Sequence, residues 1–160
     1  MQSLPGTKSC FVCGRHNPIG LNLRFETDGI RVQTRFVPSP THVGFRNTVH
    51  GGLIATLLDE VMVWACGVRT KRFAYCAEMT VRYAHPLQPG REVLAVGELA
   101  NNRRNKLFEA RGELRDPAGL VLATAVGKYL PVKQGDWVQI AEDFEPGLEP
   151  ILWGDSENRP

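Results

Sequence analysis

The chain has 160 residues, of which 42% are apolar, 8% aromatic and 22% charged, and these proportions are typical of a folded globular domain. The formal net charge of +2 is too small to indicate a nucleic-acid or membrane partner. The longest nearly uncharged stretch, residues 48–58, is about half as long as the roughly 20 apolar residues that span a bilayer. Because the N-terminal residues also lack the charged start and apolar run of a secretion signal, we expect a cytoplasmic protein.

Charge is distributed unevenly along the chain. Residues 133–160 hold seven acidic and two basic side chains, a net charge of −5, whereas residues 1–132 carry a net charge of +7. The basic part either binds a polyanionic small molecule, such as a nucleotide-bearing cofactor, or pairs with the acidic part, which is the simpler interpretation. We divide the chain into an irregular N-terminal arm of residues 1–19, a folded domain of residues 20–132 and an acidic C-terminal tail of residues 133–160.

Two of the four cysteines have a suggestive spacing. Cys10 and Cys13, followed by Gly14, form half a zinc knuckle, but no second cysteine or histidine pair completes the four ligands of a structural zinc site. His16 is the only nearby candidate for a third ligand. We therefore expect the two thiols to pack as small apolar side chains in a tight turn, and we predict no metal site.

Hydrophobic patterning predicts strands on both sides of one helix. Residues 21–25 and 30–36 alternate between apolar and polar, and Asp28-Gly29 supplies a hairpin turn between them. Helix formers dominate residues 53–68. Four more strand-like runs follow, separated by short polar loops: residues 73–83, 92–100, 107–114 and 120–130. A helix that is apolar around most of its circumference must be buried, so the sequence predicts an α+β fold, with an antiparallel sheet of about six strands wrapped around one long central helix.

The predicted helix carries two charged residues, Asp59 and Glu60. At about 100° per residue, Asp59 shares a stripe with small residues such as Gly52 and Ala55, whereas Glu60 lines up with large ones such as Trp64. Burying a carboxylate is costly unless the group is paired or takes part in chemistry. Asp59 is therefore a candidate for a catalytic group as well as for a structural one.

His50-Gly51-Gly52 stands where this helix begins. In the first turn of a helix, backbone N–H groups have no partner within the helix, and the helix dipole favours negative charge. Because neither glycine has a side chain, a substrate oxyanion could approach these amides closely. The alternative is that the glycines only allow close packing of the helix on the sheet and that His50 caps the helix.

Several segments together resemble the hot-dog fold acyl-CoA thioesterases of the phenylacetic-acid-pathway type. These segments are His42-Val43-Gly44, His50-Gly51-Gly52 followed by Asp59, and residues 77–83 with Pro86 and Gly90. The arm with Cys10 and Cys13 resembles one found in a branch of this family. The resemblance extends over residues 10–132, and it implies a hot-dog domain in residues 20–132. It also implies a homodimer or a dimer of dimers, with sites at the subunit interface.

The resemblance also implies the site residues. The expected catalytic residues are Asp59, Gly52, His50 and Asn47. The helix N-terminus would bind the thioester carbonyl through the Gly52 amide, assisted by Gly51 or His50, and Asn47 would contact water or the carbonyl. Asp59 of the other subunit would act as a general base or as a nucleophile.

Further residues are expected to bind the substrate. Cys76 stands where many members of the family have threonine, and we expect its side chain to line the pocket. Arg103, Arg104 and Lys106 lie in a polar hairpin, as solvated turn residues or as contacts to the phosphates of coenzyme A. The predicted activity is hydrolysis of a small-to-medium or aryl acyl-CoA. Coenzyme A is part of this substrate, so no separate cofactor is expected.

Other classes of function compete with this prediction. A hot-dog hydratase or dehydratase would use similar residues on the acyl chain, without releasing a thiol. A non-catalytic acyl-CoA binding module would leave the thioester intact. A zinc-ribbon nucleic-acid binder would need a complete four-cysteine site, which the sequence does not show.

Overall fold

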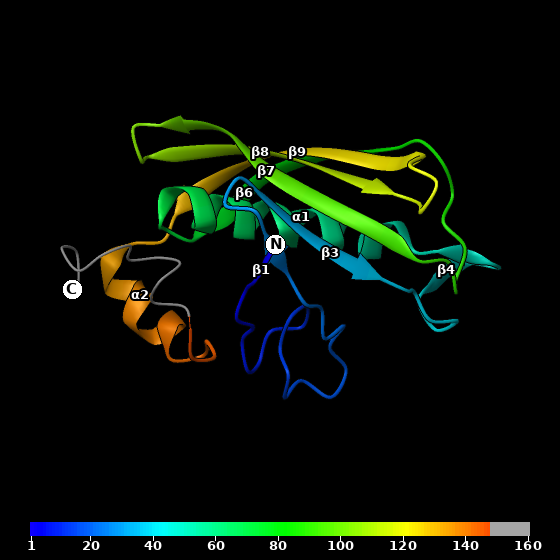
Figure 1. Ribbon diagram of the computed structural model, residues 1–160, viewed down its shortest axis with the longest axis horizontal. Helices are drawn as coiled ribbons and strands as arrows, with labels where there is room; N and C mark the ends of the chain where they lie inside the picture. The colour runs from blue at the N-terminus through cyan, green and yellow to red at the C-terminus, as the bar shows by residue number, and fades with distance from the viewer. Residues whose placement is uncertain (148–160) are drawn as a thin grey trace.

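A seven-stranded antiparallel sheet curls around one long helix in the computed structural model of the protein, which describes residues 1–147 (Figure 1). The elements, in chain order, are β1 Gln2–Ser3, β2 Glu26–Thr27, β3 Arg31–Phe36, β4 Val43–Phe45, β5 Thr48–Val49, α1 Gly51–Thr70, β6 Ala74–Tyr83, β7 Val93–Arg103, β8 Leu107–Arg115, β9 Val121–Pro131 and α2 Gln134–Ala141. Strands of the large sheet follow the order β1-β2-β3-β7-β8-β9-β6, and β4 and β5 form a separate hairpin before α1. This arrangement confirms the predicted α+β fold.

The structure differs from the sequence prediction mainly on the N-terminal side. Residues 21–25 do not form the predicted strand, because their backbone pairs with the arm: the Leu23 N–H donates to the Val12 carbonyl at 2.9 Å. Only the two residues of β2 are left to pair with β3. The arm also contributes β1, in which Gln2 lies opposite Thr27, so the sheet has seven strands where about six were expected.

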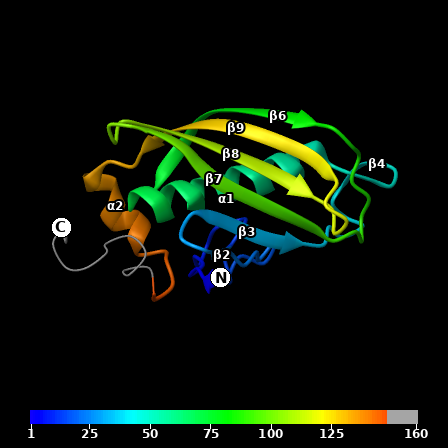
Figure 2. The same ribbon diagram turned by 45° about the horizontal axis from the view of Figure 1, so that its top comes forward.

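Helix α1 is longer than the predicted helix of residues 53–68 and begins directly after its N-cap, His50. At its other end, Lys71 adopts a left-handed conformation (φ 61°) and its N–H donates to the Gly67 carbonyl at 2.8 Å. The side chains of its middle turns are fully buried: Leu57, Leu58, Val61 and Met62. Although α1 is long and apolar enough to cross a membrane, it is the core helix here, with the sheet curled around it (Figure 2).

Strand β7 approaches the backbone of α1 closely at Gly97. A Cβ atom at this position would lie 2.5 Å from the Val61 carbonyl oxygen and 2.9 Å from the Met62 nitrogen. No side chain fits between the two backbones, so glycine is what allows a central strand to lie directly against the helix.

The arm and the tail meet on the side of the molecule away from the sheet (Figure 1). Asp143 accepts hydrogen bonds from the Ser9 N–H at 3.1 Å and the Ser9 hydroxyl at 2.8 Å, and Arg15 forms a salt bridge with Glu145 at 2.7 Å. Phe144 packs against aromatic rings of α1, of the segment after α1 and of α2: Trp64, Phe73 and Trp137. In residues 133–147, the acidic tail therefore pairs with the arm. The rest of the predicted tail, residues 148–160, lies outside the described residues.

Strand β6 forms one edge of the large sheet and pairs only with β9 within the described chain. Most of its residues are exposed, including the large side chains of Tyr75 and Tyr83. Its register shifts between Cys76 and Glu78, which marks a β-bulge. Cys76, at this bulge, lies beside Asp59 of α1, so this carboxylate is close to the edge of the sheet.

Candidate active site

Asp59 projects from the middle of α1 toward the sheet. The hydroxyl of Tyr129, on β9, donates to its Oδ1 atom at 2.9 Å. Asp59 is half-buried, whereas Tyr129 is fully buried. Burial and the adjacent Asp59 carboxylate raise the pKa of Tyr129, so its hydroxyl keeps its proton and remains a donor. The tyrosine thus fixes the direction in which the carboxylate points.

Two thiols lie close to the same carboxylate. Burial raises the pKa of Cys76 to about 11 and that of Cys66 to about 12, and Asp59 adds to both shifts. Both cysteines are therefore protonated near neutral pH, which does not suit a nucleophile. Cys76 is exposed at the sheet edge, and Cys66 is buried on α1. Asp59 is therefore the candidate reactive group of this cluster.

The start of α1 forms a second group of candidate residues. The His50 Nδ1 atom accepts the Gly52 N–H at 2.9 Å, and the Tyr83 hydroxyl donates to the Gly51 carbonyl at 2.9 Å. With Nδ1 accepting, a neutral imidazole carries its proton on Nε2, and the ring is exposed. A substrate oxygen that reached the Gly52 amide would have to displace this ring. The Nε2–H group is an alternative donor for that oxygen.

Asn47 lies in the turn between β4 and β5, just before the start of α1. It is exposed and adopts a left-handed conformation (φ 60°), which asparagine tolerates better than most residues. The hairpin is joined to the helix start by the His50 N–H, which donates to the His42 carbonyl at 2.9 Å. The structure therefore places Asn47 near the His50 group and on a different part of the chain from Asp59.

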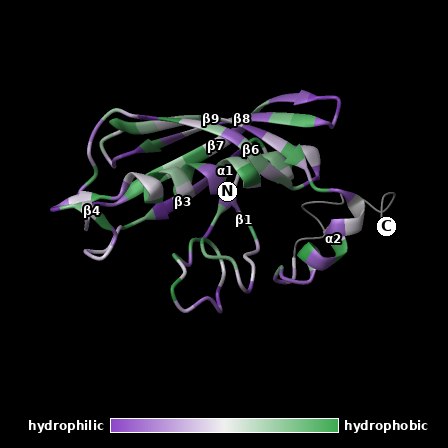
Figure 3. Cartoon of the chain, turned by 180° about the vertical axis from the view of Figure 1, so that it is seen from behind, coloured by the Kyte–Doolittle hydropathy of each residue, from purple (hydrophilic) through white to green (hydrophobic). Residues whose placement is uncertain are grey.

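The basic hairpin lies at the other end of the molecule. Arg104 has a left-handed conformation (φ 54°) in the turn between β7 and β8, and Arg103 forms a salt bridge with Glu109 at 2.6 Å. Arg72, just after α1, donates to the Asn105 carbonyl at 3.3 Å, so the hairpin neighbours the C-terminal end of the helix. Figure 3 shows the hydrophilic tip of this hairpin at the end opposite β4. Within one chain, Arg103, Arg104 and Lys106 lie far from the start of α1.

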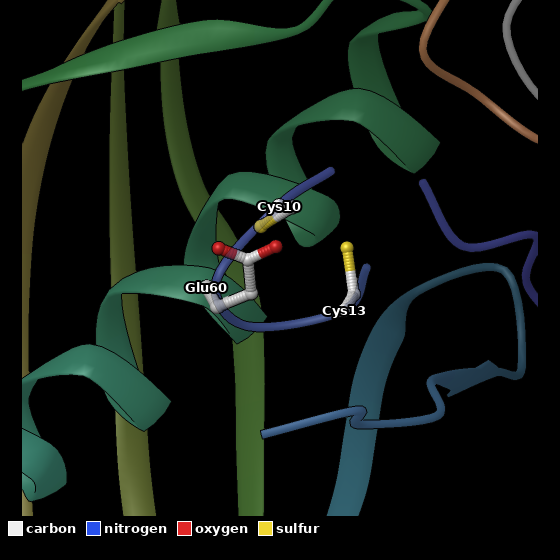
Figure 4. Close-up of side chains that lie close together, drawn as sticks. All are labelled: Cys10, Cys13 and Glu60. Carbon is white, nitrogen blue, oxygen red and sulfur yellow. The ribbon is translucent and has the colours of Figure 1, made fainter. Parts of the chain in front are cut away.

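Glu60 points toward the arm, about 100° around α1 from Asp59. The Trp64 Nε1–H donates to it at 3.3 Å, and burial raises the pKa of Glu60 to about 8. Cys10 and Cys13 face this carboxylate (Figure 4). A hydrogen bond from the Cys13 thiol lowers the pKa of Cys10 to about 5 and raises that of Cys13.

The sequence analysis did not identify Tyr129 as a partner of Asp59 or Glu60 as a neighbour of the two cysteines. Tyr129 has one available signal, because it is a hydroxyl-bearing residue at an inward-facing position of a strand, where a polar group needs a partner. Glu60 belongs to the arm cluster through a contact about 50 residues away in the sequence, which spacing alone does not reveal. His16, the ligand candidate from the sequence, is exposed and does not belong to that cluster.

A central helix enclosed by one antiparallel sheet, with a carboxylate in the middle of the helix, defines a hot-dog protein. Comparison with known families and structures agrees with this class. The model of the thioesterase superfamily matches residues 46–123. The chain is therefore similar to the thioesterase superfamily in the sequence of residues 46–123 and in its fold.

Three solved structures are similar to the chain. A thioesterase superfamily protein is 22% identical with a TM-score of 0.69, and the match covers 77% of this chain and 63% of that one. The Escherichia coli PaaI protein from the phenylacetic acid degradation operon is 16% identical with a TM-score of 0.64, and the match covers 71% of this chain and 81% of that one. A Streptococcus mutans protein bound to acetyl-CoA is 15% identical with a TM-score of 0.65, and the match covers 74% of this chain and 94% of that one. No curated protein sequence matches the chain.

Proposed function

We propose that the protein is an acyl-CoA thioesterase that hydrolyses a small-to-medium or aryl acyl-CoA to the free acid and coenzyme A. The observation that carries the proposal is the Asp59 carboxylate, held by the Tyr129 hydroxyl at 2.9 Å and opening toward a free sheet edge. Similarity to the thioesterase superfamily and the acetyl-CoA bound to a protein of the same fold support it. Coenzyme A is part of the substrate, no further cofactor is proposed for the reaction, and the cytoplasm remains the expected location.

The chemistry follows one of two routes from Asp59. As a general base, the carboxylate takes a proton from a water molecule, the hydroxide adds to the thioester carbonyl, and the carbon–sulfur bond breaks. The proton then passes to the departing sulfur, so that free acid and coenzyme A thiol are formed. As a nucleophile, the carboxylate displaces the thiol to form an anhydride, which water then hydrolyses. In both routes, a donor such as the His50 Nε2–H group stabilises the negative charge on the carbonyl oxygen.

The site requires two chains. Gly52 and Asp59 are seven residues apart on one helix, which corresponds to a rise of about 10 Å. The carbonyl oxygen that the helix start would bind and the carbon that Asp59 would attack are directly bonded atoms of one thioester. The helix start and Asp59 of the same chain are too far apart to act on both atoms. We propose a homodimer, alone or paired into a tetramer, in which the His50 group of one chain faces Asp59 of the other. The hairpin with Arg103, Arg104 and Lys106 would then contact the phosphates of coenzyme A bound across the interface.

Hydrolysis of a panel of acyl-CoA esters, followed with a thiol-trapping dye, tests this function. We expect the wild-type chain to release thiol and Asp59→Asn to be at least about 100-fold slower, because the base or nucleophile is lost. Glu113→Gln, which neutralises a carboxylate on β8 that is paired with Arg115, is the matched control and should keep the wild-type rate. Circular dichroism should show that both variants are folded.

Two results would exclude the proposal. Conversion of enoyl-CoA or hydroxyacyl-CoA esters without thiol release would assign the site to a hydratase or dehydratase. Binding of acyl-CoA without turnover of any ester in the panel would assign it to a binding module. Near-normal turnover by a folded Asp59→Asn variant would leave the thioesterase class in place and remove Asp59 from its mechanism.

A further inference from the structure

Three metal-ligating side chains converge where the arm meets α1. The sulfur atoms of Cys10 and Cys13 and a carboxylate oxygen of Glu60 all lie within 4.8 Å of one another. In a tetrahedral zinc site, with metal–sulfur bonds of about 2.3 Å and metal–oxygen bonds of about 2.1 Å, ligand atoms are roughly 3.5–3.8 Å apart. Small side-chain rotations therefore bring the three atoms onto one ion. Figure 4 shows the Cys10 sulfur next to the Glu60 carboxylate and the Cys13 sulfur to one side of it.

The backbone around the cysteines suits thiolate ligands. The Val12 N–H donates to the Cys10 sulfur at 3.2 Å, and the Gly14 N–H donates to the Cys10 carbonyl at 2.9 Å, which closes the turn. A Cβ atom on Gly14 would lie 2.3 Å from that carbonyl oxygen, so the turn requires glycine. The Thr7 hydroxyl lies 3.4 Å from the Cys13 sulfur. These contacts orient both sulfurs, as the outer-shell partners of a metal site do.

The cluster also lacks an internal source of positive charge. Among residues 1–147, no lysine, arginine or histidine forms an ion pair with Glu60, and the Trp64 indole that donates to it is uncharged. A bound divalent cation would let the two thiols and the carboxyl group release their protons and would compensate the resulting negative charge inside the partly buried site. The sequence alone predicts that the two thiols only pack as apolar side chains. That prediction does not explain why the carboxylate of Glu60, on α1, lies next to them.

We propose that Cys10, Cys13 and Glu60 bind a thiophilic divalent cation, preferentially zinc. The bound ion would anchor the N-terminal arm to the middle of α1. Two thiolate ligands favour zinc over magnesium or calcium. A water molecule completes the tetrahedron. The ion is structural, because its ligands come from the arm and from the side of α1 that faces the arm, whereas Asp59 contacts Tyr129 on β9. It makes the arm part of the folded core.

Metal content measured on the full-length chain tests this site. The protein is purified without a metal-affinity tag, and zinc is measured by mass spectrometry before and after addition of one equivalent of Zn²⁺ under reducing conditions. We expect one zinc per chain after this addition. Fewer than about 0.1 zinc per chain, or a Cys10–Cys13 disulfide found in the purified protein, would overturn the proposal.

Cobalt substitution identifies the ligands. Co²⁺ bound by two thiolates should give a sulfur-to-cobalt charge-transfer band and the intense visible bands of tetrahedral coordination. Cys10→Ser and Cys13→Ser should each weaken the charge-transfer band, whereas Glu60→Gln should keep it and lower the cobalt affinity at least about tenfold. Unchanged affinity in Glu60→Gln would overturn the site as proposed.

Two matched variants separate this site from the other candidates. Cys76→Ala removes a thiol outside the cluster, and His16→Ala removes the histidine nearest in sequence to Cys13. Both should bind cobalt as the wild-type chain does. Loss of binding in His16→Ala, with full binding in Glu60→Gln, would assign the third ligand to the arm and contradict the proposal. Since wild-type metal content is measured first, a variant that fails to fold does not decide the outcome.

Discussion

The hydrogen bond from Tyr129 to Asp59 is the most consequential single contact of the candidate active site. Tyr129 is fully buried, and its hydroxyl donates to the carboxylate at 2.9 Å. A hydrogen bond to a charged group is worth about 1.5–3 kcal/mol, and this one also determines which oxygen of Asp59 faces the open sheet edge. The tyrosine is therefore a positioning residue.

Tyr129→Phe should consequently lower kcat about tenfold or more while leaving KM for the acyl-CoA nearly unchanged. The ring remains to fill the core, so the variant should fold, and circular dichroism would check this. Thr124→Val, which removes an exposed hydroxyl elsewhere on β9, is the control and should have the wild-type kcat. A Tyr129→Phe variant with wild-type kcat would show that Asp59 needs no such orientation.

The sequence predicts residues of this site only where the signal is local. The small-residue stripe on the helix singles out Asp59, and the glycines after His50 mark the helix start, because both patterns lie within a few turns. Tyr129 meets Asp59 across 70 positions of the chain and Glu60 meets Cys10 across 50, and these contacts depend on how the sheet and the arm fold over α1. Spacing in the sequence carries no information about such contacts.

At the scale of elements, the packing of β7 against α1 depends on one missing side chain. Gly97→Ala should destabilise the protein by at least about 2 kcal/mol, because the added methyl group would lie 2.5 Å from the backbone oxygen of Val61 and neither backbone can move freely. Urea denaturation would measure this loss. Gly135→Ala in α2, where an added Cβ meets nothing within 4 Å, should leave the stability unchanged or slightly higher. Equal midpoints for the two variants would contradict this view of the packing.

The long elements are predictable because their patterns are strong, whereas the short ones are not. Alternation over β8 and β9 and the apolar circumference of α1 agree with their burial in the structure. Residues 21–25 alternate just as clearly, and Leu23 and Phe25 are indeed buried, yet their backbone bonds to the arm. Alternation reports which side chains face the core, but it does not report which backbone supplies the hydrogen-bond partner.

At the scale of the whole molecule, the free edge of β6 predicts self-association. Exposed strand edges pair with other strands, and the two halves of the candidate site need two chains. Light scattering after gel filtration should give about twice the chain mass of 17.8 kDa, or four times if dimers pair. An active species of 17.8 kDa would contradict both the assembly and the shared site.

Charge on the β6 edge should disrupt this assembly. Thr80→Asp places like charges near each other when two copies of β6 pair, so the dimer should dissociate at about tenfold higher concentration and activity should fall with it. Thr124→Asp, on the interior strand β9, should leave the mass unchanged. Loss of activity without loss of the dimer in Thr80→Asp would place the shared site elsewhere.

The contact between arm and tail has a consequence for how the protein is made. Ser9 and Arg15 leave the ribosome first, but their partners Asp143 and Glu145 are synthesised more than 120 residues later. The outer side of the arm therefore stays uncovered until all strands of the sheet around α1 have been synthesised. An ion can enter from solvent during that interval and is enclosed when the last contacts close.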